Sequence, residues 1–251
     1  MPMLVSRSIN NIPFQVKINN AYLSHSVCSR KVCGSHLTHR RNEMKVAIIG
    51  TGNMGAGLAT ELAAAKFEVV IGSRDPAKAA ALAEKIGSNA QGGGIAAAVK
   101  LADTVILALP YGAISDALRV AGDLSGKTLV DITNPISADY KSLVIGHTTS
   151  AAEEIQALAP TAKVVKAFNT IFASLLPADA RKTQTLQVFV AGNDATAKDE
   201  VSQLAKSIGF EPVDAGPLSN SRFIEPIGEM NIQFGFFLGK GTVVAPAWVQ
   251  V

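Results

Sequence analysis

Three glycines, Gly50, Gly52 and Gly55, stand in the spacing G-x-G-x-x-G within the segment GTGNMG. This spacing is typical of a dinucleotide phosphate loop when a strand precedes it and a helix follows it. Gly50 would allow the tight turn, Gly52 would let the backbone approach a pyrophosphate, and Gly55 would let helix and strand pack closely. The start of the helix would offer free N–H groups to the phosphates; the alternative is a glycine-rich turn without a ligand. The remaining contacts of this loop are predicted at Thr51, Asn53 and Met54.

The segment IGSRDPAK, which ends the next apolar run, indicates which dinucleotide is bound. A site for NAD usually places a carboxylate here to hold the ribose hydroxyls, whereas Ser73 and Arg74 offer a hydroxyl and a permanent planar cation. Lys78 could add a second cation, and Asp75 could cap the helix that starts at Pro76 and so point away from the phosphate. This pattern favours NADP over NAD; the alternative is that Arg74 and Lys78 are solvated surface charges.

Apolar runs that alternate with helix-forming segments must position these residues. Such alternation predicts an α/β fold with a doubly wound, mostly parallel sheet, a Rossmann-like NAD(P)-binding fold. We expect one such domain over residues 44–251, preceded by an extension over residues 1–43, and an interruption of the last helix near Pro226. The expected strands are 44–50, 67–73, 103–110, 127–135, 162–170, 186–192 and 210–216, and the expected helices are 53–66, 76–87, 94–102, 112–124, 150–160, 194–209 and 219–239.

The composition narrows the class of protein. The chain is 48% hydrophobic, yet no apolar run reaches the roughly 18 residues of a membrane helix, so we expect a cytoplasmic protein that does not interact with membranes. Residues 1–43 hold six of the 23 basic residues and one of the 20 acidic ones, so the net charge of +3 comes from this extension. The rest of the chain gives no reason to expect nucleic-acid binding.

The extension itself allows three interpretations. Cys28, Cys33, His36 and His39 lie close together, but their spacing is not that of a standard zinc finger, and we expect no metal site. The basic, acid-poor composition is compatible with organelle targeting. We favour a dispensable extension, with Met44 as the natural first residue.

Four segments together resemble a known family: MKVAIIGTGNMGAGLA, VVIGSRDPAKA, VVKAFNT and DAGPLSNSRFIEP. They are similar to the NADP oxidoreductases that depend on the deazaflavin coenzyme F(420), and to the NADPH-oxidising domain of the six-transmembrane epithelial antigen metalloreductases. The resemblance covers roughly residues 44–239. It implies that NADP(H) lies along the strand ends and that a flavin-type partner packs against the nicotinamide.

The resemblance also implies roles for residues beyond the glycine loop. Leu109 and Pro110 would lie along the nicotinamide half, and Asn169 and Thr170 would orient the nicotinamide; the alternative for the latter pair is strand-end capping. Archaeal deazaflavin enzymes tend to carry His where Asn169 stands, so a common flavin could replace the deazaflavin. The wall that faces the second ring would contain Leu218 and Ser219.

We therefore expect an NADP(H)-dependent oxidoreductase that transfers hydride between NADPH and F(420), FMN or FAD, a small redox carrier that diffuses freely. One alternative is a reductase of a small carbonyl or imine, which needs a proton donor, and the candidates Tyr111 and Lys166 are not convincing. Another is a non-catalytic NADP-binding sensor. His147, in the polar segment GHTTS, is expected on the surface. The apolar segment IQFGFFLG, residues 232–239, predicts either a homodimer surface or a helix packed on the sheet.

Overall fold

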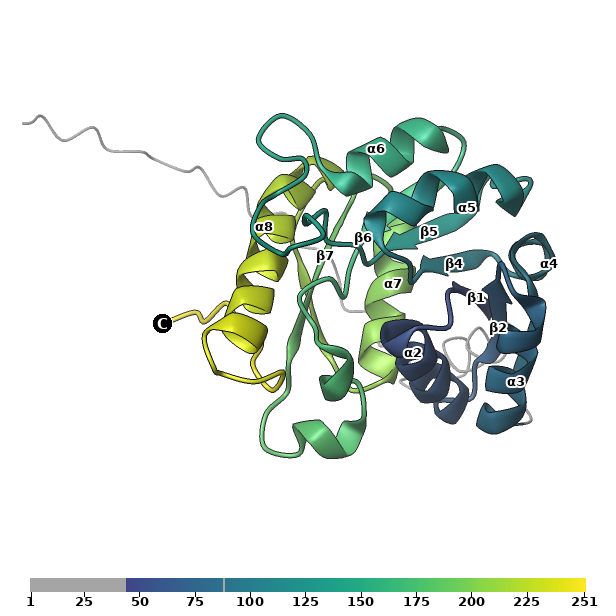
Figure 1. Ribbon diagram of the computed structural model, residues 1–251, viewed down its shortest axis with the longest axis horizontal. Coiled ribbons are helices and arrows are strands. Elements are labelled where there is room, and N and C mark those ends of the chain that lie inside the picture. Colours follow the sequence, from purple (N-terminus) through teal and green to yellow (C-terminus); the bar gives the residue numbers. More distant parts are fainter. Residues whose placement is uncertain (1–43, 88) are drawn as a thin grey trace, which may run out of the picture.

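A computed structural model of the chain describes residues 44–87 and 89–251. Eight strands form one sheet in the order β3-β2-β1-β4-β5-β6-β7-β8 (Figure 1). All neighbouring strands run parallel except β6 and β7, which pair antiparallel. The proposed interpretations of residues 1–43 lie outside the described residues. The strands are β1 (Lys45–Ile49), β2 (Glu68–Ser73), β3 (Ala90–Gly94), β4 (Thr104–Leu107), β5 (Thr128–Asp131), β6 (Lys163–Lys166), β7 (Gln187–Gly192) and β8 (Glu211–Asp214).

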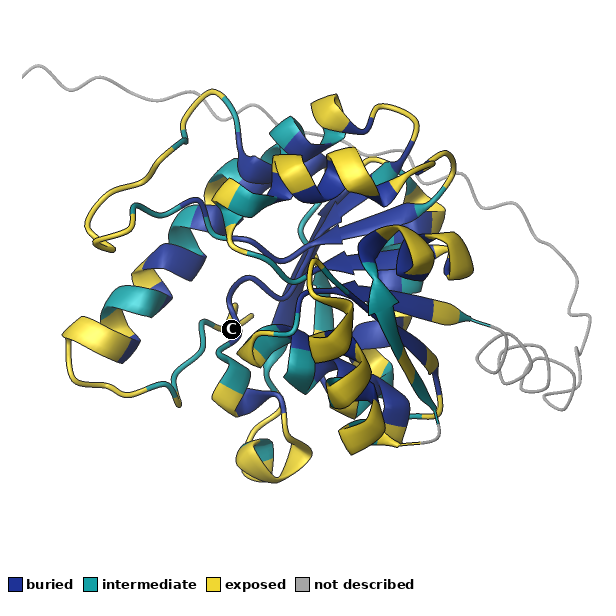
Figure 2. Cartoon of the chain, turned by 45° about the vertical axis from the view of Figure 1, so that its right-hand side comes forward, coloured by how far each residue is buried: buried dark blue, intermediate teal, exposed yellow. Residues whose placement is uncertain are grey.

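Helices cover both faces of the sheet, which confirms the doubly wound fold. Strand β1 shows why: Val46 and Ile48 belong to a buried cluster that includes residues of α2, α3 and α7, whereas Ala47 and Ile49 belong to a second cluster that includes residues of α4, α5 and α6. The strands between the two edge strands β3 and β8 are therefore buried on both faces, and the exposed residues of the helices lie on their outer sides (Figure 2). The helices are α2 (Asn53–Ala64), α3 (Pro76–Ile86), α4 (Ile95–Leu101), α5 (Ile114–Ala121), α6 (Ala151–Leu158), α7 (Ala195–Ser207) and α8 (Ser221–Ile232).

Strand β3 was not expected from the sequence, because AQGGG has neither the β-branched residues nor the alternation of a typical strand. It lies at the edge of the sheet and pairs with β2. A Cβ atom on Gly92 would lie 2.2 Å from the Ala79 carbonyl oxygen, so glycine lets helix α3 approach the strand. The glycine at position 92 of β3 is therefore explained by the close packing of this strand against α3.

The last helix also differs from the expectation. The predicted interruption near Pro226 is wrong, since α8 continues through this residue and then passes into a π-helical turn, Gln233–Phe237. Proline removes one backbone hydrogen bond, but the buried side of α8, which includes Ile224 and Glu225, holds the helix against the rest of the fold. Within the described residues, no helix has the length and apolarity to span a membrane.

Strands β5 and β6 end earlier than predicted, at Asp131 and Lys166. Phe168 then adopts a positive φ of 57°, a conformation that few non-glycine residues adopt. The chain therefore leaves the sheet before Asn169, which places this residue and Thr170 in a connection rather than in a strand.

Candidate functional site

The glycine loop has the geometry that its spacing predicts. Gly50 has a φ of 123°, and a Cβ atom there would lie 2.2 Å from the carbonyl oxygen of Ala108. A Cβ atom on Gly55 would lie 2.2 Å from the Gly50 carbonyl oxygen, so this glycine allows α2 to pack directly on the turn. At Gly52 a Cβ atom would meet nothing within 4 Å, because this glycine faces open space. The backbone of the loop is therefore accessible to a ligand.

Helix α2 begins directly behind this loop. Its N-cap is Gly52, and no side chain caps its first N–H groups. Asn53 is exposed, while Thr51 and Met54 are half-buried. Uncapped N–H groups and the positive end of the helix dipole can hold an anion such as a pyrophosphate.

The end of β2 lies beside the loop, because the Gly50 N–H donates to the Gly72 carbonyl oxygen over 2.9 Å. Asp75 caps α3 by accepting from the N–H groups of Ala77 and Lys78, as the sequence predicted. The Lys78 ammonium is 3.9 Å from the Asp75 carboxylate. Arg74 and Lys78 are both exposed at this end of β2.

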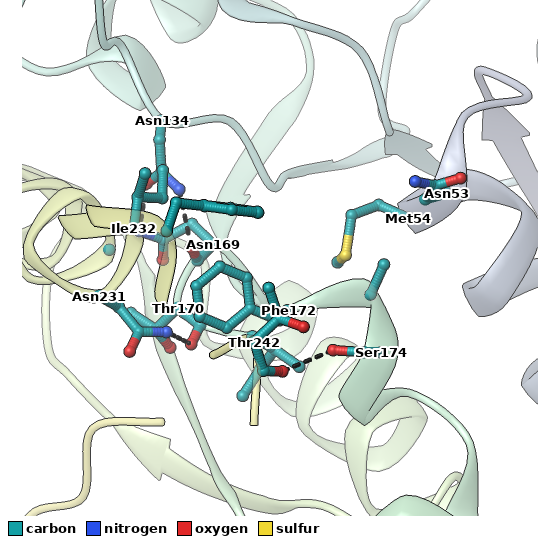
Figure 3. Close-up of a pocket in the computed structure, with 14 residues that line it drawn as sticks. Asn53, Met54, Asn134, Asn169, Thr170, Phe172, Ser174, Asn231, Ile232 and Thr242 are labelled. Atoms are coloured by element: carbon teal, nitrogen blue, oxygen red, sulfur yellow. Dashed lines mark hydrogen bonds between the residues drawn. The ribbon is translucent and has the colours of Figure 1, made fainter. Parts of the chain in front are cut away.

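A cavity of about 430 Å³ lies between the start of α2 and helix α8 (Figure 3). Four of the predicted site residues line it: Asn53, Met54, Asn169 and Thr170. None of the described lining residues carries an ionisable side chain. The other lining residues are Asn134, Ile171, Phe172, Ala173, Ser174, Gly228, Asn231, Ile232, Phe236 and Thr242.

Two asparagines form the inner wall of this cavity (Figure 3). The Asn169 side-chain amide donates to Asn134 Oδ1 over 2.9 Å and to the Ile224 carbonyl oxygen over 3.1 Å. In return, the Asn134 side-chain amide donates to the Asn169 carbonyl oxygen over 2.8 Å. A Cβ atom on Gly228 would lie 2.5 Å from Asn134 Oδ1 and 2.7 Å from Asn169 Nδ2, so α8 touches the pair through a glycine.

Asn169 and Thr170 also carry unused hydrogen-bonding capacity. Asn169 is 6% exposed and Thr170 is 1% exposed. Among the described residues, neither Asn169 Oδ1 nor Thr170 Oγ1 has a hydrogen-bond partner. Buried polar atoms are nearly always paired, so such atoms beside a cavity are candidates for contact with a ligand.

The far wall of the cavity joins the connection after β6 to the C-terminal part of the chain. The Phe172 and Phe236 rings meet edge to face, with 5.5 Å between their centroids. The Ser174 hydroxyl donates to the Thr242 carbonyl oxygen over 2.5 Å. This wall was not predicted from the sequence, although Phe172 stands three residues after Asn169 and could have been included with the AFNT segment.

Four predicted residues lie elsewhere. Leu109 is half-buried and Pro110 is exposed, both just after β4. Leu218 is only 2% exposed, and its N–H donates to Asn193 Oδ1. Neither these three nor Ser219 line the cavity. His147 is exposed, as expected.

Lys166 lies in a buried cluster of charges behind the cavity. Its ammonium donates to Asp131 and Glu225, each over 2.8 Å, and to the Thr133 carbonyl oxygen over 2.6 Å. Glu225 also accepts from the N–H groups of Ala151 and Ala152, which begin α6. The cluster thus joins β5, β6, α6 and α8, and all protons of Lys166 are engaged.

Tyr111, the other candidate proton donor, is also engaged. Its hydroxyl donates to the Glu154 carboxylate. Burial and this hydrogen bond raise the pKa of Tyr111 well above its usual value of 10.0. A phenol held in this way is a poor acid, and Tyr111 does not line the cavity.

Glu229 gives the cluster a pH dependence. Burial, and then the neighbouring Glu225 carboxylate, raise its pKa from 4.5 to about 7, with Lys166 opposing the shift. A carboxyl with a raised folded-state pKa contributes stability below pH 4.5 that is lost as the pH rises through 7.

We expect the stability of Glu229→Gln to fall less than that of the wild type between pH 5 and pH 8, as measured by the midpoints of urea unfolding. If the variant lost as much stability between the two pH values as the wild type, the raised pKa of Glu229 would be contradicted. The matched control is Glu211→Gln, because Glu211 is exposed.

With this geometry established, similarity to known proteins identifies the family. The model of a family described as NADP oxidoreductase coenzyme F420-dependent matches residues 45–135. An F420-dependent NADP reductase of Methanothermobacter marburgensis is 36% identical over 200 residues, which cover 73% of this chain and 89% of that protein. This chain belongs to that family of NADP-dependent oxidoreductases. A solved structure from Arthrobacter sp. FB24 resembles this family member with a TM-score of 0.71 and 35% identity, over 78% of this chain and 95% of that one.

The family member also resembles the metalloreductase STEAP3 of Rattus norvegicus. The two are 37% identical over 183 residues, which cover 73% of this chain but 36% of the rat protein. The chain thus spans about a third of that relative's length. These matches confirm the family and the fold that the sequence segments predicted.

Proposed function

We propose that this family member binds NADPH along the strand ends and a deazaflavin or flavin ring in the cavity, and that hydride passes between the two rings. The two carriers supply the redox chemistry. The protein supplies close stacking and orientation, which such a transfer needs more than an acid or a base. In the overall reaction, NADPH gives a hydride and the solvent gives one proton to the oxidised acceptor. The products are the reduced acceptor and NADP.

The NADPH half of the proposal is supported by three adjoining features. The backbone around Gly52 is open, the first N–H groups of α2 are uncapped, and the Arg74 and Lys78 cations are exposed at the end of β2. A pyrophosphate fits the first two features and a 2′-phosphate fits the cations. Asp75, which would repel that phosphate, is held by the N–H groups of α3.

The observation that carries the acceptor half is the uncharged cavity beside Asn53 and Met54. A cavity of this size, with aromatic walls and few polar atoms, is typical of a site for a planar organic molecule. The two unpaired atoms, Asn169 Oδ1 and Thr170 Oγ1, provide an acceptor and a donor for an amide such as that of nicotinamide.

The identity of the acceptor is the finer part of the proposal. Relatives that are named for F420 favour the deazaflavin. The family model matches residues 45–135, which carry the phosphate loop and the 2′-phosphate site, while most of the cavity wall lies beyond them. The match therefore supports the proposed NADP site, and the identity of the acceptor is the subject of the following experiment.

Anaerobic absorption spectra test the proposal. We expect that NADPH, together with a catalytic amount of the protein, bleaches the absorption of at least one of F420, FMN and FAD. The variant Asn169→Ala should slow this bleaching at least about tenfold and should still bind NADPH. Asn89→Ala is the matched control, because Asn89 bonds the Ala63 carbonyl oxygen away from the cavity.

Bleaching of none of the three acceptors would overturn the proposal. If NADPH then reduced a small carbonyl or imine, the alternative reductase would be favoured. If NADPH bound but reduced nothing, the non-catalytic sensor would be favoured. The engagement of Tyr111 with Glu154 and of Lys166 with Asp131 and Glu225 speaks against the reductase, which needs a free proton donor.

A further inference from the structure

The side-chain amides of Asn134 and Asn169 each have a single allowed orientation (Figure 3). The Asn134 Nδ2 atom donates to the Asn169 carbonyl oxygen over 2.8 Å, and the Asn169 Nδ2 atom donates to the Ile224 carbonyl oxygen over 3.1 Å. A backbone carbonyl can only accept, so an amide nitrogen must face each of them. Asn134 Oδ1 is then left to accept from Asn169 Nδ2 over 2.9 Å. A flip of either amide would bring two oxygen atoms together, so both orientations are fixed.

This arrangement leaves one atom of the pair without a partner. Asn169 lines the cavity, and its Oδ1 atom has no hydrogen-bond partner in the part of the chain that the structure describes. An amide oxygen accepts and cannot donate. It therefore matches a ligand group that carries an N–H, such as a carboxamide or a ring imide, and it mismatches a carboxylate, which also only accepts.

The backbone that carries Asn134 is held on both sides. The Thr133 N–H donates to Asp131 over 2.8 Å, and the Thr133 carbonyl oxygen accepts from the Lys166 ammonium over 2.6 Å. The Asn134 carbonyl oxygen accepts from the Ile136 N–H over 2.9 Å. The buried charged cluster behind the cavity therefore fixes the position from which Asn134 reaches Asn169.

Helix α8 closes on the pair through Gly228. A Cβ atom on this residue would lie 2.5 Å from Asn134 Oδ1, 2.7 Å from Asn169 Nδ2 and 2.9 Å from the Asn169 carbonyl oxygen. Glycine disfavours the interior of a helix, but here it is the residue that lets the two asparagines keep their hydrogen bonds. The glycine at this position is therefore explained by the asparagine pair.

We propose that Asn134 is a positioning residue, which holds Asn169 as a fixed hydrogen-bond acceptor for an amide or imide N–H of the bound redox ring. Asn134 thereby makes the site selective against a ring that lacks this N–H. The inference rests on the proposed function, because the N–H belongs either to the carboxamide of the nicotinamide or to the imide of a flavin-type acceptor. Asn134 acts through Asn169 and needs no contact with the ligand itself.

The binding of two ligand pairs to the full chain, measured by calorimetric titration, tests the proposal and locates the N–H. In the first pair, NADP is compared with its nicotinic-acid analogue, in which a carboxylate replaces the carboxamide. In the second pair, FMN is compared with N3-methyl-FMN, in which a methyl group replaces the imide hydrogen. The wild type should prefer the N–H form in one of the pairs by about 30-fold or more, because the other form leaves Asn169 Oδ1 unpaired.

The variant Asn134→Leu is similar in size but cannot bond to Asn169. It should lower that preference by about fivefold or more, the typical effect of one hydrogen bond, because the Asn169 amide loses one of the two acceptors that orient it. Asn89→Leu is the matched control and should leave both preferences unchanged. Asn89 is also half-buried, and it donates to the Ala63 carbonyl oxygen away from the cavity.

Two further variants separate positioning from a loss of packing. In the background of Asn169→Ala, the replacement Asn134→Leu should have no further effect on the preference, because Asn134 acts only through Asn169. Gly228→Ala favours the helix yet should also lower the preference, because its methyl group displaces the pair. Circular dichroism of each variant confirms that the fold is retained.

The proposal is wrong if the wild type binds NADP or FMN but shows neither preference, or if Asn134→Leu leaves the preference at its wild-type value. It is also wrong if Asn134→Leu lowers the preference equally with and without Asn169→Ala, because Asn134 would then act on the cavity independently. A wild type that binds neither NADP nor FMN would refute the proposed function, and this inference with it.

Discussion

Replacing Lys166 by methionine is expected to lower the free energy of unfolding by about 3–5 kcal/mol, because it leaves buried carboxylates without their cation. Lys166 and Asp131 are fully buried, and Glu225 is 2% exposed. Burial raises the pKa of Glu225, and Lys166 opposes that rise. Without the ammonium, Glu225 must either bind a proton or remain charged in an apolar setting.

The pH dependence of the variant follows from this argument. A carboxyl with a raised pKa in the folded state loses its contribution to stability as the pH rises. We therefore expect the deficit of Lys166→Met, measured by urea unfolding, to be larger at pH 8 than at pH 5. The double variant Lys166→Met/Glu225→Gln should be less impaired than the single one, since it removes one of the two unpaired charges.

Lys163→Met is the matched control for this experiment. Lys163 begins the same strand, but its ion pair with Asp194, at 3.3 Å, is about two-thirds buried rather than fully buried. Such partly exposed pairs contribute about 0–1 kcal/mol. Similar losses in the two variants would mean that the buried cluster gives the fold no special stabilisation.

Replacing Arg74 by alanine is expected to raise the dissociation constant for NADPH by about 10- to 150-fold. This range corresponds to the loss of a charge-assisted hydrogen bond of about 1.5–3 kcal/mol. The affinity for NADH, which has no 2′-phosphate, should change little. Calorimetric titration of both nucleotides measures the ratio.

Lys85→Ala serves as the control for Arg74→Ala, because Lys85 lies in the last turn of α3, at the end away from the proposed phosphate site. Equal NADPH affinities of wild type and Arg74→Ala would remove Arg74 from the site. A parallel loss of NADH affinity would instead indicate that Arg74 stacks on the adenine, which both nucleotides share.

The geometry of the glycine loop and of the Asp75 cap could be predicted because its determinants are local in the sequence. Gly50, Gly52 and Gly55 belong to one turn, and the cap formed by Asp75 spans three residues. Gly50 and Gly55 each meet a steric requirement that residues with a Cβ atom do not meet, and Asp75 is one of the few residue types that cap a helix, so the sequence reveals these positions. The same holds for the strands β1, β2 and β4, which are short apolar runs.

The cavity could be predicted only in part, because it is assembled from distant segments. Asn134 and Asn169 meet through two hydrogen bonds across 35 residues, and Gly228 then fits against both. No local pattern marks Thr242 as a wall residue. The charged cluster was missed for the same reason: Lys166 looks like an ordinary strand lysine until Glu225 is brought beside it by the fold.

The antiparallel strand β7 has a consequence for how the activity of this family member can vary. A parallel neighbour of β6 would require a crossover helix, whereas the reversed strand leaves the connection 167–186 free to form the floor of the cavity. Changes in α8 and in the part of this connection beyond Thr170 would therefore reshape the cavity without altering the residues of the glycine loop or of the end of β2. Under the proposed function, exchange of this part of the connection between relatives would be a route to new acceptors.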